Sequence, residues 1–338
     1  MNFPLLSLKS SCRPLWGRPP GLRGTPRSRG VFAALVLLAL ALPVPATTLF
    51  VTISGKGGEP DYEQRFKMLA TDLESSVKKA GGETETYTLI DPTREQIRSK
   101  LAEVAHRAKP ADALVVTLIG HGTFDGVDYK FNVTGPDITG GELAALLDRV
   151  PATRQLVVNT TSASGGSIAA LRKPNRIVVC ATRSGTEKNA TVFARYWVDA
   201  LRDPAADTDH NEDVSALEAF RFAQRKTAEF FDTQKRLATE HSVLEDTGKG
   251  DGERNPNPTG DNGQGRLANS FALVRLGANA AAARDPEKRP LLDKKEQLEQ
   301  AIDKLKYQKA SIPAEQYKQQ LTALLLELAK VQEALEKQ

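Results

Sequence analysis

The chain has 338 residues, with 46 Lys and Arg against 42 Asp and Glu, and two cysteines. Six of the basic residues lie in the first thirty positions, where no acidic residue occurs, so beyond residue 46 the chain keeps 40 basic and 42 acidic residues. A nearly neutral mature chain gives no argument for nucleic-acid binding, although the pI of the whole sequence is 8.9. Cys12 belongs to the leading segment, and the single remaining thiol, Cys180, excludes an intramolecular disulfide and a cysteine-ligated zinc site.

Residues 1–46 have the layout of a secretory signal peptide. A basic stretch is followed by the apolar run Val31–Leu42, and small residues at Val44 and Ala46 fit cleavage after Ala46. The apolar run is shorter than the ~20 residues that a membrane-spanning helix needs, so no stable membrane span is expected. We therefore expect export to the periplasm or the extracellular space, with a retained anchor as the alternative.

From Thr47 to Leu201, short β-branched runs alternate with longer amphipathic ones. This alternation predicts an α/β fold, a parallel sheet with helices on both faces. The expected strands are Thr48–Ser54, Glu83–Thr88, Ala113–Ile119, Gln155–Asn159 and Arg176–Thr182, with a ribbon at Val127–Val133. The expected helices are Tyr62–Ala80, Thr93–Ala108, Thr139–Asp148, Gly165–Leu171, Asn189–Leu201 and Ser215–Lys235.

The second half of the chain changes character twice. Thr247–Gly265 is dense in Gly, Pro, Asn and Asp and is predicted to be a loop, and Gly265–Leu276 is predicted to be a strand that closes a domain of residues 47–280. In residues 285–338, apolar residues with heptad spacing follow Pro313, which predicts a helical hairpin of coiled-coil type. We expect such a tail to act as a helical cap or as an element of self-association, with the binding of a specific partner as the alternative.

The chemistry of the chain centres on two predicted strand ends. His121, flanked by Gly120 and Gly122, directly follows the most apolar strand, and reacting groups of parallel sheets lie outside the carboxyl ends of the strands. The next strand ends in a run of small residues, from Thr160 to Gly166, that includes Ser162. Cys180 lies inside a predicted strand, where a buried small hydrophobe is the expected role.

A His-Gly after one strand and a small-residue turn ending in Ser-Gly after the next resemble the caspase-like fold, and in particular the legumain-type (clan CD, C13 family) cysteine peptidases. The resemblance covers roughly residues 48–276 and implies that His121 is the catalytic histidine. Ser164-Gly165 match the family's Ser-Gly, and Ser162 occupies the position of the nucleophilic cysteine. A serine hydroxyl is a weak nucleophile unless a base activates it, and Asp125 is the one guess for a third group that orients the histidine.

The resemblance implies a peptidase-class hydrolase or its weakly active descendant, with a peptide or protein substrate. His121 would act as the general base, Ser162 as the nucleophile, and the N–H groups of Gly122 and Ser162 as the oxyanion hole. Arg183, after the following strand, could receive an acidic or amide side chain. The alternative is a pseudoenzyme, a non-catalytic module that keeps the peptide groove as a binding or scaffold surface.

The stretch from Asp207 to Glu218 fits the twelve-residue EF-hand loop that binds calcium. Oxygen-bearing side chains stand at the six ligand positions, and helices are predicted on both sides. The sixth position is Glu212, where that loop usually has a glycine. No cofactor is required by the expected chemistry, and calcium is the one ion that the sequence suggests. The alternative is an acidic loop in which Asp207 and Glu218 only cap the flanking helices. The six residues are Asp207, Asp209, Asn211, Asp213, Ser215 and Glu218.

Overall fold

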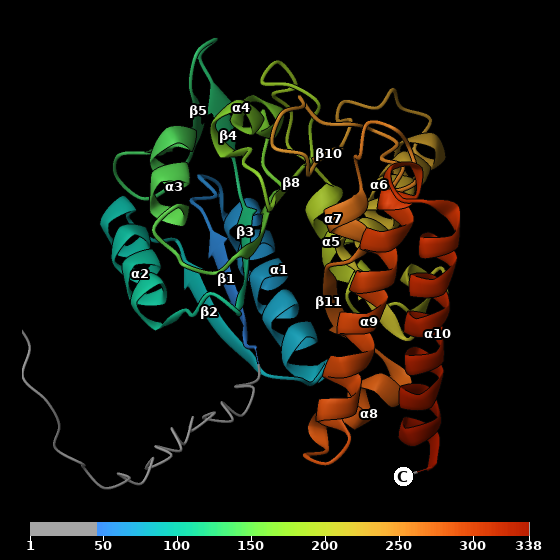
Figure 1. The fold of residues 1–338 in the computed structure, drawn as a ribbon. Coiled ribbons are helices and arrows are strands. Elements are labelled where there is room, and N and C mark those ends of the chain that lie inside the picture. The colour runs from blue at the N-terminus through green and yellow to red at the C-terminus, as the bar shows by residue number, and fades with distance from the viewer. Residues whose placement is uncertain (1–45, 338) are drawn as a thin grey trace, which may run out of the picture. The chain divides into compact units, whose positions relative to one another are not determined.

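The structure is a computed structural model that describes residues 46–337, apart from the side chains of Asp303, Tyr307 and Ala310. Its centre is a six-stranded sheet in which neighbouring strands are parallel, except that β10 runs antiparallel to β8 (Figure 1). The predicted α/β architecture is therefore confirmed. In order across the sheet, the strands are β10 (Val243–Glu245), β8 (Arg176–Cys180), β7 (Arg154–Asn159), β3 (Ala113–Ile119), β1 (Thr48–Ser54) and β2 (Thr84–Ile90).

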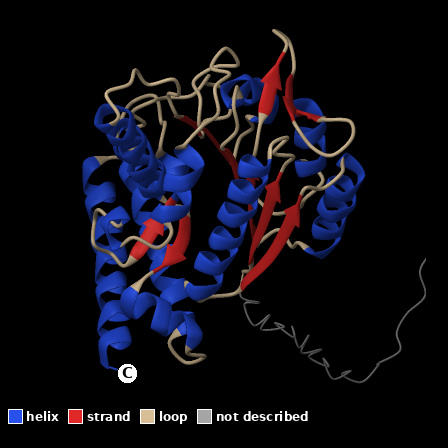
Figure 2. Ribbon diagram, turned by 180° about the vertical axis from the view of Figure 1, so that it is seen from behind, coloured by secondary structure: helices blue, strands red, loops and turns tan. Residues whose placement is uncertain are grey.

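Both faces of this sheet are buried because successive side chains of each strand point to opposite faces. In β3, Val115 and Ile119 join one apolar cluster, while Leu114 and Val116 join another. Figure 2 shows the strands between helices, and helices cover both faces. The first cluster includes side chains of α1 (Pro60–Lys79), α5 (Phe193–Ala200) and α6 (Ala216–Thr233), and the second those of α2 (Arg94–Arg107), α3 (Gly140–Leu147) and α4 (Ile168–Leu171).

The predicted ribbon at Val127–Val133 is part of a small antiparallel sheet rather than a single strand pair. It consists of β4 (Gly122–Phe124), β5 (Tyr129–Phe131) and β6 (Ile138–Thr139). The tip between β4 and β5 is exposed, and Val127 there keeps 84% of its surface accessible. Because β4 starts at Gly122, this ribbon begins one residue after His121.

The predicted strand Gly265–Leu276 is wrong in its first half. The chain forms the short helix α7 (Arg266–Asn269) and then β11 (Ala272–Arg275), which pairs with β9 (Asp213–Ser215) in a separate two-stranded sheet. The cause is Asp246, whose carboxylate accepts hydrogen bonds from the N–H groups of Gly265 and Ala268 at 2.8 and 3.1 Å. Carboxylates that accept N–H groups at a helix start stabilise the first turn.

The predicted C-terminal hairpin is confirmed as helices. After α8 (Gly277–Arg284), the hairpin consists of α9 (Arg289–Tyr307), a 3₁₀ turn (Gln308–Ser311) and α10 (Ala314–Lys337). Its heptad stripe is used within the chain, since Val331 is buried and Leu335 packs against Ala283 and Leu292. The hairpin is not a free appendage, because Glu296 of α9 forms ion pairs with Arg154 and Arg275, and the described residues, 46–337, belong to one compact unit. Self-association remains a prediction.

The predicted signal peptide, residues 1–46, lies outside the described residues except for its last position. Among the helices of the described part, none is both long enough and apolar enough to cross a membrane.

Candidate functional site

The structure brings the two predicted turns into contact. The N–H of Thr160, after β7, donates to the carbonyl of Leu118 in β3 at 3.0 Å, so the carboxyl ends of the two strands lie side by side. Gly122 then lies against the second turn so closely that a Cβ at this position would be 2.5 Å from the carbonyl oxygen of Ser162. The backbone of the His-Gly turn therefore touches the backbone of the predicted nucleophile, and only glycine fits there.

His121 is held by helix α1. The centre of its ring is 4.7 Å from that of Tyr62 and 5.1 Å from that of Phe66, both in edge-on geometry. Burial lowers the pKa of His121 below its usual value, while a hydrogen bond with the backbone of Gly57 and the charge of Glu59 oppose this shift. The imidazole is therefore largely neutral at pH 7, which is the form that can accept a proton as a general base.

Ser162 is almost enclosed, with 3% of its surface exposed. The next residue, Ala163, has a φ of 55°, in the left-handed region that side chains other than glycine rarely adopt. Its N–H donates to the carbonyl of Glu187 at 2.8 Å, which secures this strained turn. Within residues 46–337, no hydrogen bond joins the ring of His121 to the hydroxyl of Ser162. The turns are adjacent, but the two side chains are not paired.

A buried polar network supports the Ser162 turn from below. The hydroxyl of Tyr129 lies 2.6 Å from Oγ1 of Thr161 and 3.2 Å from Oδ1 of Asn159, and Nδ2 of Asn159 donates to Ser167 at 3.0 Å. Burial raises the pKa of Tyr129, so its phenol stays protonated. Buried networks whose members are all satisfied make the backbone around them rigid. The sequence signal for this network was the run of small hydroxyl residues, but its partner in β5 was not predictable.

Cys180 is fully buried in β8, as predicted. Burial raises the pKa of its thiol to about 12, and the thiol donates to the carbonyl of Ser164 at 3.3 Å. A neutral, enclosed thiol is inert, because the thiolate is the reactive form. Cys180 therefore supports the same turn and is no alternative nucleophile.

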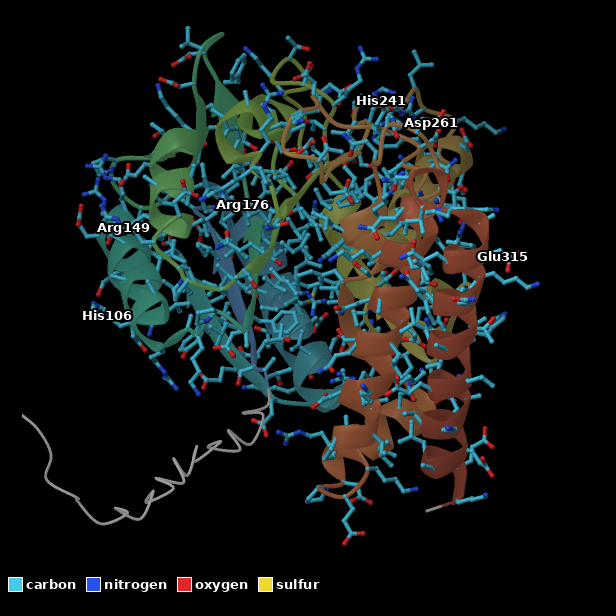
Figure 3. The ribbon with its side chains drawn as sticks, in the orientation of Figure 1. His106, Arg149, Arg176, His241, Asp261 and Glu315 are labelled. Carbon is cyan, nitrogen blue, oxygen red and sulfur yellow. The ribbon has the colours of Figure 1, made fainter. Side chains whose placement is uncertain are left out.

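The segment after β8 wraps around the Ser162 turn. The side chain of Arg183 is exposed, and its backbone N–H donates to the carboxylate of Glu187 at 2.9 Å. The other oxygen of Glu187 lies 2.6 Å from Nδ1 of His241, which Figure 3 shows among the loops at the top of the view. The role of Arg183 as a substrate-binding residue stays a prediction. The pairing of Glu187 with His241 was missed, because 54 residues separate them.

Glu240, next to His241, is a buried carboxylate at the start of α5. It accepts hydrogen bonds from the N–H groups of Val192 and Phe193 at 2.7 and 3.3 Å. Burial raises the pKa of Glu240 to about 7, and the charge of Glu187 acts in the same direction. The interaction anchors the segment before β10 to the helix that follows Glu187.

Asp125 does not orient His121. Its carboxylate accepts from the N–H groups of Val127 and Asp128 at 3.0 and 2.9 Å and pairs with Lys130 at 2.9 Å, all within the tip of the β4–β5 ribbon. These bonds lower the pKa of Asp125 well below its usual range. The guess that Asp125 is the third group of a catalytic triad is therefore wrong, and its role is to close the turn.

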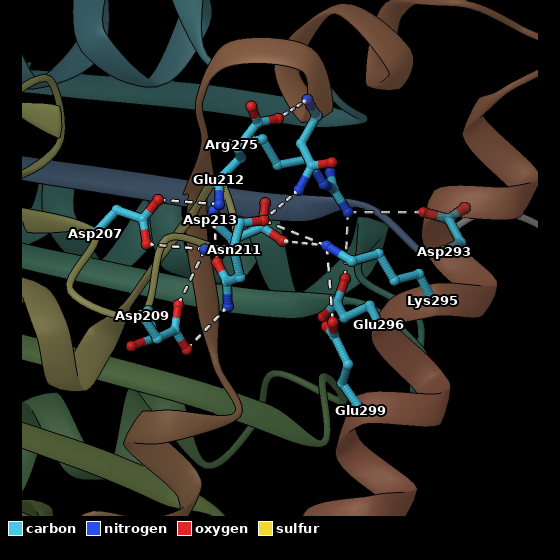
Figure 4. A network of polar contacts seen from close by, with 12 residues as sticks. Asp207, Asp209, Asn211, Glu212, Asp213, Arg275, Asp293, Lys295, Glu296 and Glu299 are labelled. Atoms are coloured by element: carbon cyan, nitrogen blue, oxygen red, sulfur yellow. Dashed lines mark hydrogen bonds and ion pairs between the residues drawn. The ribbon is translucent and has the colours of Figure 1, made fainter. Parts of the chain in front are cut away.

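The predicted calcium loop adopts the turn that an EF-hand loop needs, without the glycine (Figure 4). Glu212, at the sixth position, has a φ of 65°, and its N–H donates to Asp207 at 2.9 Å. Carboxylate oxygens of Asp207, Asp209 and Glu218 lie within 4.8 Å of one another. Burial raises the pKa of Asp209, and the charges of Glu218 and Asp207 add to this effect, as expected of crowded like charges.

All six predicted ligands also have hydrogen-bond partners within the protein, since Asp207 and Asp209 accept from Asn211 and Glu218 accepts from Thr208 and Ser215. The side-chain oxygen of Asn211 accepts from the N–H of Asp213 at 2.7 Å, while the carboxylate of Asp213 lies 3.9 Å from Nζ of Lys295 in α9. Ser215 caps α6 and forms a capping box with Glu218. Asp209 and Asn211 also line a cavity of about 380 Å³ between this loop and the hairpin. The structure thus brings the carboxylates of Asp207, Asp209 and Glu218 together, with the side chain of Asn211 bonded to Asp209 and that of Ser215 bonded to Glu218.

Solved structures match part of this chain. No protein-family model matches this sequence, and no curated protein matches it. The crystal structure of caspase-1 from Spodoptera frugiperda matches with a TM-score of 0.45 and 12% identity, over 60% of this chain and 87% of that one. The Drosophila initiator caspase Dronc matches with a TM-score of 0.41 and 13% identity, over 60% of this chain and 80% of that one. Both matched structures are those of caspases.

Proposed function

We propose that the chain is a weakly active peptidase-type hydrolase, a relative of the C13 peptidases that uses a His121 and Ser162 dyad on peptide substrates. The observation that carries this proposal is the contact between the two turns, with a neutral imidazole on one and a hydroxyl on the other. A base and a nucleophile at neighbouring strand ends are the minimum that acyl transfer needs. The rigid network below Ser162 supports the same conclusion, since catalytic groups must be held in place.

In this proposal His121 takes the proton of Ser162 as the hydroxyl attacks the peptide carbonyl, and later gives it to the leaving amine. The N–H groups of Gly122 and Ser162 would stabilise the oxyanion. The Gly57 backbone and the charge of Glu59 favour the protonated imidazole, but burial outweighs them, and within the described residues no carboxylate is hydrogen-bonded to the His121 ring as in a triad. Weak activity follows, because the missing pairing of the two side chains must form when substrate binds.

The test is hydrolysis of a quenched peptide library by residues 47–338. We expect His121→Ala to lower the rate by about 10²–10⁴-fold, the usual contribution of a general base. His106→Ala is the matched control, since His106 is an exposed residue of α2, and this variant should keep the wild-type rate. Equal loss in both variants, or none in either, would contradict the assignment.

A second function is favoured by one observation. Ser162 is 3% exposed and carries no hydrogen bond to His121 in the described part of the chain, which suits a pseudoenzyme that binds peptides without cleaving them. Peptide binding that survives His121→Ala and Ser162→Ala, with no product formed by the wild type, would identify this non-catalytic binding module.

We also propose export, with removal of residues 1–46. The N–H of Thr47 lies 2.9 Å from the carboxylate of Asp112, which is 5% exposed and also accepts the N–H of Lys109 at 2.8 Å. Cleavage after Ala46 would convert this amide into an ammonium group, and hydrogen bonds between charged partners are stronger than neutral ones. A mass that begins at Thr47 in protein recovered outside the cytoplasm is the expected result, whereas an intact leader would contradict it.

We further propose that the loop Asp207–Glu218 binds calcium weakly. Three carboxylates within 4.8 Å repel one another until a cation neutralises them. We expect calcium at about ten times its dissociation constant to stabilise the fold by about 1.4 kcal/mol, which a thermal melt detects as a rise in Tm that EDTA reverses.

The calcium effect should disappear in Asp207→Ala, which removes one of the three carboxylates. Asp261→Ala is the matched control, because Asp261 is exposed and lies in a different loop, and this variant should keep the full rise in Tm. A rise of the same size in both variants would show that calcium acts elsewhere.

A further inference from the structure

Phe124 fills a slot between two glycines. A Cβ at Gly185 would lie 2.2 Å from Cδ1 of the Phe124 ring, and a Cβ at Gly166 would lie 2.7 Å from Cδ2. Neither glycine has a positive φ, so the backbone at both positions would accept a side chain. It is the ring of Phe124 that requires glycine on both sides. The slot is therefore shaped around a flat aromatic group.

This slot adjoins the candidate nucleophile. Gly166 belongs to the same turn as Ser162, and Gly185 lies in the segment that wraps around this turn. A Cβ at Gly165 would be 2.3 Å from the backbone of Arg183, so the two walls of the slot are in contact. Phe124 itself follows Gly122, which touches the carbonyl of Ser162. In a bound substrate peptide, the residue whose carbonyl Ser162 attacks would place its side chain beside this turn.

The element that carries Phe124 is weakly anchored. Strand β4 has three residues and pairs only with β5, and the tip beyond Phe124 is exposed at Val127. Phe124 is itself only partly buried, at the margin of the second apolar cluster. Segments with few buried contacts open at low free-energy cost. Movement of the Phe124 ring out of the slot would therefore leave the second apolar cluster intact.

We propose that the slot between Gly166 and Gly185 is the specificity pocket for an aromatic side chain of a peptide ligand, and that Phe124 is a built-in plug that occupies it in the closed form. The present occupant is a phenyl ring, so phenylalanine is the side chain whose shape the slot fits. The proposal rests on the proposed function for its location, since it deepens the same site.

The experiment measures binding of the peptide acetyl-Ala-Ala-Phe-amide to residues 47–338 by NMR titration. We expect Phe124→Ala to bind it at least tenfold more tightly than the wild type, with acetyl-Ala-Ala-Ala-amide showing no such gain. Adding Gly185→Ala to Phe124→Ala should reverse the gain, because the new Cβ enters the emptied slot. If Phe124→Ala does not fold, Phe124→Leu keeps an apolar group on the core and should give a smaller gain in the same direction.

An artificial cavity can bind aromatic molecules wherever it is made, so Phe271→Ala serves as the control. Phe271 is 3% exposed and lies beside β11, and its removal should give no gain in peptide binding over the wild type. Equal binding by wild type and Phe124→Ala, equal binding by the Phe271 variant, or no effect of Gly185→Ala would overturn the proposal. Peptide binding does not require turnover. A gain in binding by Phe124→Ala without any hydrolysis would therefore support the pocket and contradict the proposed peptidase activity.

Discussion

Replacing Ser162 by cysteine is expected to raise peptide hydrolysis on the order of a hundredfold, because a thiol loses its proton to a neighbouring imidazole far more readily than a hydroxyl does. The side chain changes by one atom, and the turn around it is fixed by the Ala163 backbone and by the network around Asn159. The neutral His121 is the base in either case. The rate is measured with the same quenched peptides as for the wild type.

The introduced thiol also has an internal control. Iodoacetamide should modify Ser162→Cys once, whereas Cys180, which is fully buried and has a pKa raised to about 12, should not react in the folded protein. The reaction should slow in the double variant with His121→Ala. A thiol at position 162 that reacts no faster than Cys180, with no gain in hydrolysis, would show that His121 does not serve this position.

Replacing Arg176 by alanine is expected to lower the free energy of unfolding by about 3 kcal/mol or more, because it leaves buried acceptors without their donor. Arg176 is 1% exposed, at the start of β8, within the sheet in Figure 3. Its guanidinium donates to Gln155 at 2.9 Å, to the carbonyl of Leu171 at 2.9 Å and to Asp148 at 2.6 Å. Denaturant unfolding measures the loss.

Lys173→Ala is the matched control for Arg176→Ala. Lys173 pairs with the same Asp148 at 3.0 Å, but its side chain is 48% exposed, so its removal should cost less than about 1 kcal/mol. Together the two donors hold the pKa of Asp148 below its usual value although burial acts to raise it. Equal losses in the free energy of unfolding in the two variants would mean that the burial of Arg176 does not strengthen the contribution of its hydrogen bonds to stability.

Apolar patterning was enough to predict the central sheet. Strands Thr48–Ser54 and Ala113–Ile119 were predicted to the residue, because short runs rich in apolar and β-branched residues are typical of parallel strands that are buried on both faces. The helices were predicted from the longer amphipathic runs between them. The short β10 was missed, because three residues carry no periodicity, and α7 was missed because it depends on Asp246, which lies twenty residues earlier in the chain.

Only those features of the candidate site that depend on neighbouring residues in the sequence were predictable. The positions of His121 and Ser162 follow from the rule that reacting groups lie at the carboxyl ends of strands. What surrounds them depends on distant segments: Tyr62 and Phe66 enclose the imidazole, and Phe124 fills the space beside Gly166. No local sequence pattern predicts such contacts, because they depend on which distant segments the fold brings together.

The intact mass of residues 47–338 after exposure to a serine-directed fluorophosphonate tests most directly whether His121 activates Ser162. We expect a single adduct on Ser162, which is absent in His121→Ala and forms more slowly as the pH falls through the pKa of His121, below 6.5. The fall follows because a protonated imidazole cannot accept the proton of the serine. A folded wild-type protein without adduct in excess reagent, or an adduct unchanged in His121→Ala, would contradict an activated Ser162.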